Sequence, residues 1–226
     1  MNKGRKVKKP LSKATVALNK QLQRRRGVRD LEKRFLIVCE DGKSAPNYFE
    51  ALKKHFGLSA TSVRVVGSGG RTQPIQVVEQ AIEIKVEAQK PDSGTEPFDQ
   101  VWCVIDGDYG DKINNARKKA KANGVELAIS TICFEHWVLL HFEENDTLAP
   151  DDKAAVKRLR KPHILPNYQK GKCDFRDVVP KVRDACARAE KLRKPGIARG
   201  ALPENQNPCS EVYMLVNAIL NSPDPA

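Results

Sequence analysis

Two aspartates separated by a single glycine have the type and spacing to bind a divalent cation. Asp106 and Asp108 follow an apolar run at residues 101–105, and alternate side chains of an extended segment point to the same side. Two like charges this close repel each other, and a bound cation relieves the repulsion. Carboxylate oxygens are hard ligands that suit Mg²⁺, or Mn²⁺ in its place. The alternative is a polar turn that simply ends a strand.

A third acid, Glu40, ends another apolar run at residues 35–39. Because the carboxyl ends of parallel strands converge on one edge of an open sheet, groups far apart in sequence can meet there. We therefore predict that Glu40, Asp106 and Asp108 form a catalytic metal site at this edge. Ser130 and the glycine turn at residues 67–70 are predicted to reach the same edge.

The elements that must position these residues alternate between strand and helix from Phe35 onward, which predicts an α/β fold with a mostly parallel sheet and flanking helices. Strands are expected at residues 35–39, 63–66, 101–105 and 125–129. Helices are expected at about 46–55, from Pro74, and at 112–123 and 134–142. Beyond Pro150 strand signals cease. We predict a basic N-terminal arm at 1–34, an α/β core at 35–150 and a basic helical C-terminal extension at 151–226.

Charge is unevenly distributed along the 226 residues, whose formal net charge is +12. Residues 1–34 hold 13 Lys and Arg against 2 acids, and residues 151–200 hold 15 against 6, whereas residues 35–150 hold 12 against 17. Basic flanks around an acidic centre favour a nucleic-acid partner, RNA or DNA, over an anionic membrane. A solvated basic tail is the alternative for the first residues. The predicted nucleic-acid contacts are Arg24, Arg25, Arg26, Lys43, Arg71 and Lys170.

The six cysteines include no Cys-x-x-Cys pair, and three of them lie in or beside apolar runs. This usage predicts reduced, mostly buried thiols and a cytoplasmic location. The basic N-terminus is not followed by an apolar signal core, and the apolar runs are too short to span a bilayer. We therefore expect no export and no membrane insertion.

Several segments, in order and spacing, resemble the RloB-like family of bacterial abortive-infection proteins over roughly residues 30–220. They are residues 35–40 (FLIVCE), 46–49 (PNYF), 101–108 (VWCVIDGD), 134–142 (FEHWVLLHF) and 207–210 (NPCS). A strand ending in Glu and a later strand ending in Asp-x-Asp also look like the Toprim core of topoisomerases, primases and OLD-type nucleases.

The resemblance implies a Toprim-like fold and a metal-dependent nuclease that cuts RNA or DNA in anti-phage defence, with a partner ATPase encoded nearby. It assigns Glu40 as general acid/base or metal ligand, and Asp106 and Asp108 as Mg²⁺ ligands. The chain departs from the family pattern at Ala45, where a second acid is common. Asp41 is a candidate to compensate.

Other polar residues have two readings. Glu135 is a candidate catalytic residue or a first-turn acid that stabilises its helix, and His141 follows the spacing of a packed helix face. Residues 67–71 (GSGGR) resemble a phosphate cradle or an ordinary turn before a helix. The competing function is a non-catalytic nucleic-acid-binding or regulatory subunit with a degenerate Toprim core.

Overall fold

The computed structural model describes residues 33–144, 146–148 and 151–222. Residues 33–222 form one compact unit, which therefore includes most of the predicted basic C-terminal extension. The predicted basic arm lies outside the described residues except for its last two positions, and so do the predicted contacts Arg24, Arg25 and Arg26.

A five-stranded sheet forms the centre of this unit, with the order β2-β1-β3-β4-β5. The strands are β1 (Phe35–Cys39), β2 (Val63–Val66), β3 (Gln100–Asp106), β4 (Glu126–Thr131) and β5 (Cys209–Ser210). The first four run parallel and β5 pairs antiparallel with β4. The chain goes from β1 outward to β2 and then returns to place β3 on the other side of β1. The order of strands thus reverses beside β1, which is where α/β sheets commonly bind ligands.

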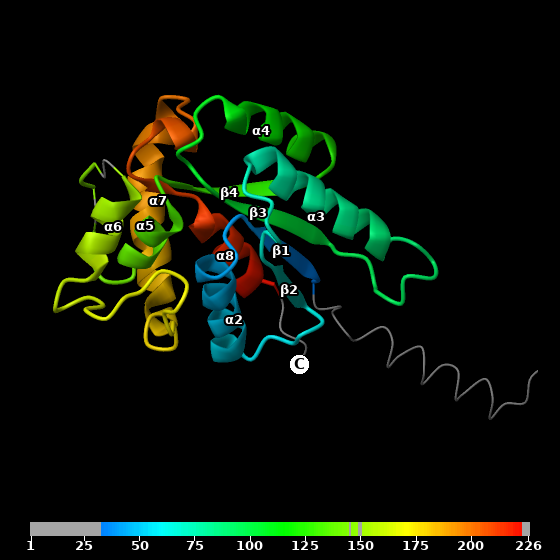
Figure 1. The fold of residues 1–226 in the computed structure, drawn as a ribbon, viewed down its shortest axis with the longest axis horizontal. Coiled ribbons are helices and arrows are strands. Elements are labelled where there is room, and N and C mark those ends of the chain that lie inside the picture. The colour runs from blue at the N-terminus through cyan, green and yellow to red at the C-terminus, as the bar shows by residue number, and fades with distance from the viewer. Residues whose placement is uncertain (1–32, 145, 149–150, 223–226) are drawn as a thin grey trace, which may run out of the picture. The chain divides into compact units, whose positions relative to one another are not determined.

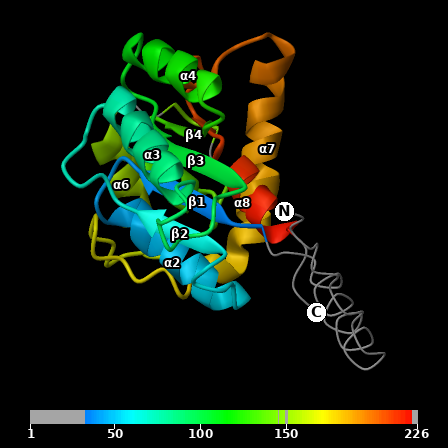
Figure 2. The same ribbon diagram turned by 90° about the vertical axis from the view of Figure 1, so that its right-hand side faces the viewer.

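Helices cover both faces of the sheet, as Figures 1 and 2 show. One face carries α3 (Pro74–Ala88) and α4 (Lys112–Ala122). The other carries α2 (Ser44–Phe56), α5 (Phe134–Leu139), α6 (Asp152–Leu159), α7 (Val182–Ala198) and α8 (Val212–Leu220). The short 3-10 helices are η1 (Val179–Lys181) and η2 (Pro203–Asn205).

Two apolar clusters, one on each face, explain why the strands are continuous apolar runs. Along β1, Phe35, Ile37 and Cys39 enter the cluster beneath α2 and α5, whereas Leu36 and Val38 enter the one beneath α3 and α4. A strand buried on both faces has no polar side, so it loses the alternation of a half-exposed strand. All six cysteines are free thiols and five are buried, as predicted.

The strands and helices before Pro150 agree closely with the sequence predictions, and β1 and β2 have the predicted bounds. The predicted helix at 134–142 is shorter, because α5 ends at Leu139. The expectation that strands end at Pro150 is wrong. Strand β5 has two residues, Cys209 and Ser210, too few to show a periodic pattern, and it forms only because α7 brings the chain back beside β4. Within the described residues, no helix is both long and apolar enough to cross a membrane.

Candidate active site

The carboxylate of Glu40 meets the end of β3 because β1 and β3 are neighbours in the sheet. The backbone N–H of Asp106 donates to Oε2 of Glu40 at 3.0 Å. Oδ1 of Asp106 in turn accepts a hydrogen bond from the backbone N–H of Phe134 at 2.9 Å, at the start of α5. Glu40 therefore reaches Asp106 at the carboxyl edge of the sheet, whereas the metal site predicted from Glu40, Asp106 and Asp108 stays a prediction.

Tyr109 completes the surroundings of Glu40. Its hydroxyl lies between Oε1 of Glu40 and the backbone oxygen of Thr72, the latter at 2.8 Å. A phenol carries one proton, so it donates to one of these acceptors at a time. Burial, followed by the charge and hydrogen bonding of Glu40, raises the pKa of Tyr109 above its ordinary value. Tyr109 therefore remains a neutral donor that holds Glu40.

The acids of this edge destabilise one another's charge. Burial raises the pKa of Asp106 well above its ordinary value, and the charges of Glu40 and Glu135 raise it further. Burial also raises the pKa of Glu40, although the hydrogen bonds from Tyr109 and from the Asp106 amide oppose the shift. Carboxylates that repel in a partly buried place create a strong demand for a positive charge.

Asp108 lies in the turn after β3 and is exposed. Its charge raises the pKa of both Glu40 and Asp106, so it lies within electrostatic reach of them. The glycine between the aspartates has a steric reason: a Cβ at Gly107 would come within 3.0 Å of the Cα of Thr131. The Gly107 amide donates to the backbone oxygen of Ser130 at 3.0 Å, which ties the turn to β4.

Asp41, next to Glu40, caps the start of α2. Both its carboxylate oxygens lie 3.1 Å from the amide of Ala45, and one lies 3.3 Å from the amide of Lys43. Helix-start amides lack backbone partners, so this contact stabilises α2. Ala45 itself is 2% exposed and belongs to the apolar core. An acid at position 45 would have to enter that core, whereas the charge of Asp41 reaches the edge and raises the pKa of Glu40.

A second buried acid, Glu135, lies in the first turn of α5 and is fully buried. Its Oε1 accepts a hydrogen bond from the hydroxyl of Tyr168 at 2.8 Å. Its Oε2 accepts no hydrogen bond and lies 3.6 Å from Nζ of Lys170. Glu135 raises the pKa of Asp106 and of Asp41 through its charge, so it belongs electrostatically to the same edge.

The donor set fits a hard cation in its chemistry, because several acids act on Asp106 with like charge and, among the described residues, Lys170 is the lysine whose charge opposes them. Oδ2 of Asp106 and both oxygens of Asp108 accept no hydrogen bond from the described residues, whereas both oxygens of Glu40 are engaged. No three His, Cys, Asp or Glu side chains among the described residues are arranged to hold a metal ion. A cation would therefore be held by Asp106 and Asp108 with much of its water shell, as Mg²⁺ commonly is.

Two polar residues near this edge have structural roles. Ser130 is fully buried, donates to the backbone oxygen of Cys133 at 2.9 Å and pairs with Ser210 in the sheet, so it is not an accessible site residue. His141 lies 3.0 Å from the hydroxyl of Tyr48 and 3.1 Å from the backbone oxygen of Trp137. Burial lowers the pKa of His141 to about 4, and the predicted role of a packed histidine is confirmed.

The predicted phosphate cradle at 67–71 forms a turn at the same edge, but its cation has a partner. Nη1 of Arg71 lies 2.8 Å from Oε2 of Glu83. Gly67 packs closely on Gly42, since a Cβ there would come within 3.2 Å of the Gly42 Cα. The close approach explains this glycine without a ligand. Lys43 is exposed and makes no ion pair with a described residue.

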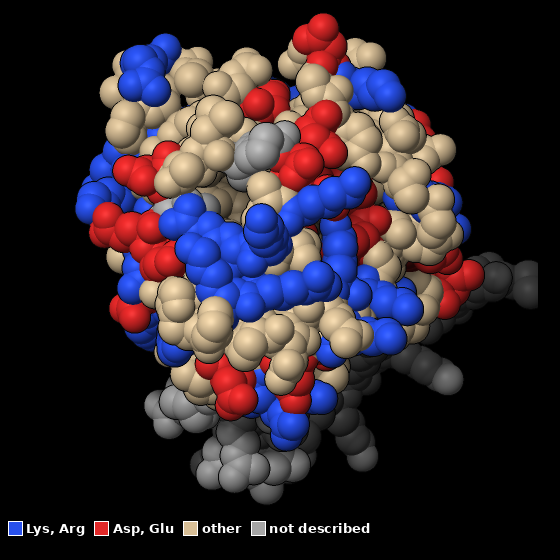
Figure 3. Space-filling model, turned by 60° about the vertical axis from the view of Figure 1, so that its left-hand side comes forward, with Lys and Arg blue, Asp and Glu red and all other residues tan. Residues whose placement is uncertain are grey.

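Basic side chains gather on the face that carries α6 and α7, interrupted by acidic ones (Figure 3). Several of these cations are already paired within the protein. Arg158 pairs with Glu143, Lys191 with Glu144 at 2.9 Å, and Lys194 with Glu190 at 3.5 Å. The excess charge of residues 151–200 is thus partly neutralised, and the remainder gives this face a positive balance.

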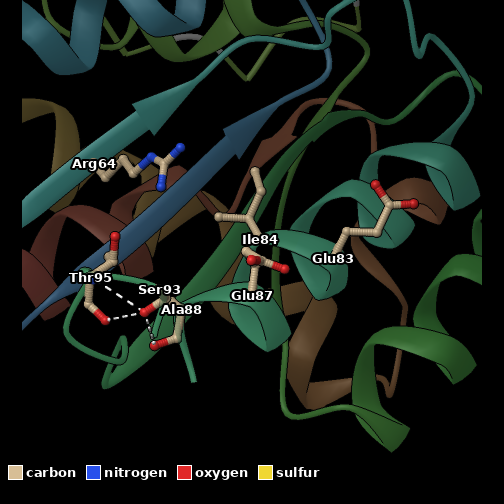
Figure 4. A pocket seen from close by; sticks show the side chains of 7 residues that line it. All are labelled: Arg64, Glu83, Ile84, Glu87, Ala88, Ser93 and Thr95. Atoms are coloured by element: carbon tan, nitrogen blue, oxygen red, sulfur yellow. Dashed lines mark hydrogen bonds between the residues drawn. The ribbon is translucent and has the colours of Figure 1, made fainter. Parts of the chain in front are cut away.

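A cavity of about 320 Å³ lies away from Glu40 and Asp106, between β2, the last turns of α3 and the loop that follows α3. Figure 4 shows its side chains, which include Arg64, Glu83 and Glu87. Because α3 runs antiparallel to the strands, its last turns lie at the opposite edge of the sheet from Asp106. A cavity of about 290 Å³ lies instead at the N-terminal ends of α3 and α4, lined partly by Gln73 and Lys112.

The comparison with protein families covers most of the described unit. A family profile described as RloB-like protein matches residues 35–219, which run from the start of β1 into the last turn of α8. The chain belongs to the RloB-like family. Comparison with curated proteins and with solved structures finds no match. The family match covers β5 and α8 as well as the sheet edge, so the C-terminal residues are part of what defines the family.

Two tyrosines at the candidate site of this RloB-like chain were missed in the sequence. Tyr109 holds Glu40 and Tyr168 holds Glu135. Each lies within two residues of a predicted site residue, Asp108 or Lys170, and that proximity was an available signal. Tyrosine has no spacing rule that marks it as a partner of a distant carboxylate, because the pairing depends on how the elements pack.

Proposed function

We propose that the protein is a metal-dependent nuclease that cuts RNA or DNA, with a Toprim-type catalytic core. The observation that carries the proposal is the contact between Glu40 and Asp106 at the reversal point of the strand order, where burial and the charges of neighbouring carboxylates raise the pKa of both acids. Strongly perturbed acids at such a place are typical of functional sites. A structural turn needs no such accumulation of like charge.

In this proposal Asp106 and Asp108 hold Mg²⁺, or Mn²⁺ in its place. Such an ion would lower the pKa of a water molecule and neutralise developing charge on a phosphodiester. Glu40 is held by Tyr109 and by the Asp106 amide, so its carboxylate is oriented to hold or accept a proton beside Asp106. Phe134 contributes its amide, which fixes the orientation of the Asp106 carboxylate.

The basic face supports a polyanionic substrate, because phosphate contacts by Lys and Arg supply affinity without sequence readout. Membership of the RloB-like family supports a role in anti-phage abortive infection. An ATPase partner encoded nearby belongs to the same proposal.

The test is to incubate the purified protein with total tRNA, plasmid and single-stranded DNA, each with Mg²⁺, Mn²⁺ or EDTA. We expect metal-dependent cleavage of at least one substrate, abolished by EDTA and by Asp106→Asn. The assay is repeated with the partner ATPase and ATP. Absence of cleavage under both conditions, with nucleic-acid binding retained, favours the competing function of a non-catalytic binding subunit.

A further inference from the structure

The segment that follows α6 is anchored against the candidate active site at two points. The amide of Gly171 donates to the hydroxyl of Ser44 at 3.0 Å, in the first turn of α2. The buried Tyr168 donates to Glu135 at 2.8 Å. Lys170 lies between these two anchors in the sequence, so its backbone is held from both sides.

The ammonium group of Lys170 is placed among acids without being hydrogen-bonded to them. Its Nζ lies 3.6 Å from Oε2 of Glu135 and 3.8 Å from Oδ2 of Asp152, and 45% of the side chain is exposed. Both distances exceed that of a hydrogen bond. Within the described part of the chain, Lys170 donates no hydrogen bond, so its three N–H donors remain available to a ligand.

The same ammonium group acts electrostatically on the predicted catalytic acids. Burial alone would lower the pKa of Lys170, but the charges of Glu135 and Asp106 raise it above its ordinary value. The charge of Lys170 in turn acts to lower the pKa of Asp106 and Asp41. Lys170 therefore remains charged and lies within reach of the edge where Asp106 and Glu40 meet.

A phosphodiester approaching this edge meets several carboxylates that repel it, and a fixed cation offsets that repulsion. We infer that Lys170 binds the phosphodiester of the substrate beside Asp106, and that Glu135 and Tyr168 are positioning residues that hold Lys170 there. The inference rests on the proposed nuclease function and deepens it by assigning a substrate contact. It also makes Glu135 a residue that holds Lys170 in position and not a ligand of the metal ion.

A purely structural ion pair has a different geometry in this protein. Arg193 and Glu211 are joined by a hydrogen bond of 3.1 Å, and both side chains are nearly buried. Lys170 is half exposed and too far from Glu135 for such a bond. The unused donors of Lys170 are what a binding site for a phosphodiester requires, and the negative charge of Glu135 keeps the ammonium group in place.

The first test compares Lys170→Met with Lys172→Met. Lys172 is exposed in the same segment, so its removal controls for the general loss of one positive charge. We expect Lys170→Met to lower kcat by roughly tenfold to a hundredfold, the range for losing a donor to transition-state charge. Lys172→Met should change KM modestly and leave kcat unchanged. Equal kcat values for the two variants would overturn the inference.

The second test is a double-mutant cycle between Glu135→Gln and Lys170→Met, with Tyr168→Phe as a further variant. If Glu135 acts through Lys170, Glu135→Gln lowers kcat by about tenfold or more alone and adds no loss in the Lys170→Met background. The Mg²⁺ concentration for half-maximal activity should not change. An increased Mg²⁺ requirement, or additive losses, would show that Glu135 acts on the metal and would overturn the positioning role.

Folding and the wider proposal are checked separately. Lys170→Met leaves Glu135 buried without a cation, so the double variant, which removes both charges, is the folded reference in thermal melts.

Oligonucleotide binding in EDTA tests Lys170 without catalysis. The slope of log affinity against log salt concentration should fall in magnitude by about 0.7 for a single strand. If the wild type never cleaves but this slope falls, the nuclease proposal fails and the phosphate contact stands. An unchanged slope overturns the contact.

Discussion

Two regions of the protein bury acids, and they differ in the partners that these acids have. In one region the partner is an arginine, and in the other the partners are uncharged hydrogen-bond donors. Near η2 and α7, Glu211 accepts a hydrogen bond from Arg193, which also donates to Gln206 at 3.0 Å. At the edge formed by β1 and β3, Glu40 and Asp106 accept hydrogen bonds from backbone amides and a tyrosine, while the charges of other acids raise the pKa of both.

The difference separates an acid that is paired with an arginine from the acids that we propose to bind a cation. Burial raises the pKa of Glu211, and the hydrogen bond and charge of Arg193 oppose the shift. For Asp106, the neighbouring carboxylates Glu40, Glu135 and Asp108 add to the effect of burial, and Lys170 is the charged group that opposes it. An arginine fork would fill the space around Asp106 and exclude a metal ion. Amide donors hold the carboxylates in place and leave the charge for a ligand.

Breaking the structural pair should have the largest effect on stability. Arg193→Met removes the cation that is hydrogen-bonded to the largely buried Glu211, so we expect the free energy of unfolding to fall by about 3–5 kcal/mol. Urea denaturation measures the change. The control is Lys191→Met, whose pair with Glu144 is 70% and 61% exposed, and which should cost less than about 1 kcal/mol. Similar losses in both variants would contradict the comparison.

Neutralising Asp106 or Asp108 at the carboxyl edge of the sheet should remove activity without unfolding the protein. We expect Asp106→Asn and Asp108→Asn each to lower metal-dependent cleavage by about two decades or more, because each loses charge that holds the cation. The melting temperature of the metal-free protein should stay level or rise, since one member of a repelling group is removed. Asp92→Asn, at an exposed position, is the control. Early melting of both site variants would indicate a structural turn.

Metal binding at Asp106 and Asp108 should stabilise the protein, and this stabilisation should not depend on the pair of Arg193 and Glu211. At a Mg²⁺ concentration of one hundred times Kd, mass action predicts about 2.7 kcal/mol of added stability for the wild type. Arg193→Met should retain this increment, whereas Asp106→Asn should lose most of it. Thermal melts with Mg²⁺ and with EDTA measure both. An increment that survives Asp106→Asn would place the cation elsewhere.

The smallest expected effect comes from the tyrosine that holds Glu40. Tyr109→Phe removes a hydrogen bond to a charged group, and we expect a loss of about 1–2 kcal/mol in unfolding free energy. Cleavage should also fall, because Glu40 is no longer held beside Asp106. The control is Tyr213→Phe, since the Tyr213 hydroxyl makes no hydrogen bond with the described residues. If Tyr109→Phe behaves like the control, the Glu40 contact carries no function.

The sequence by itself determined the strands and the acids that end them. Apolar runs such as 35–39 are buried on both faces, so they are visible without knowledge of the fold, and a carboxylate after such a run must lie at the edge of the sheet. For these residues, burial explains both the apolar pattern in the sequence and the position at the centre or edge of the sheet.

Only the tertiary structure decided which of these groups touch. The order β2-β1-β3 brings Glu40 to Asp106 across a separation of 66 residues, and no local pattern encodes which strands become neighbours. The short β5 and the pairing of Tyr168 with Glu135 depend likewise on where α6 and α7 return the chain. Local propensity acts over a few residues, whereas strand order and side-chain partners are selected by the joint burial of the two apolar clusters.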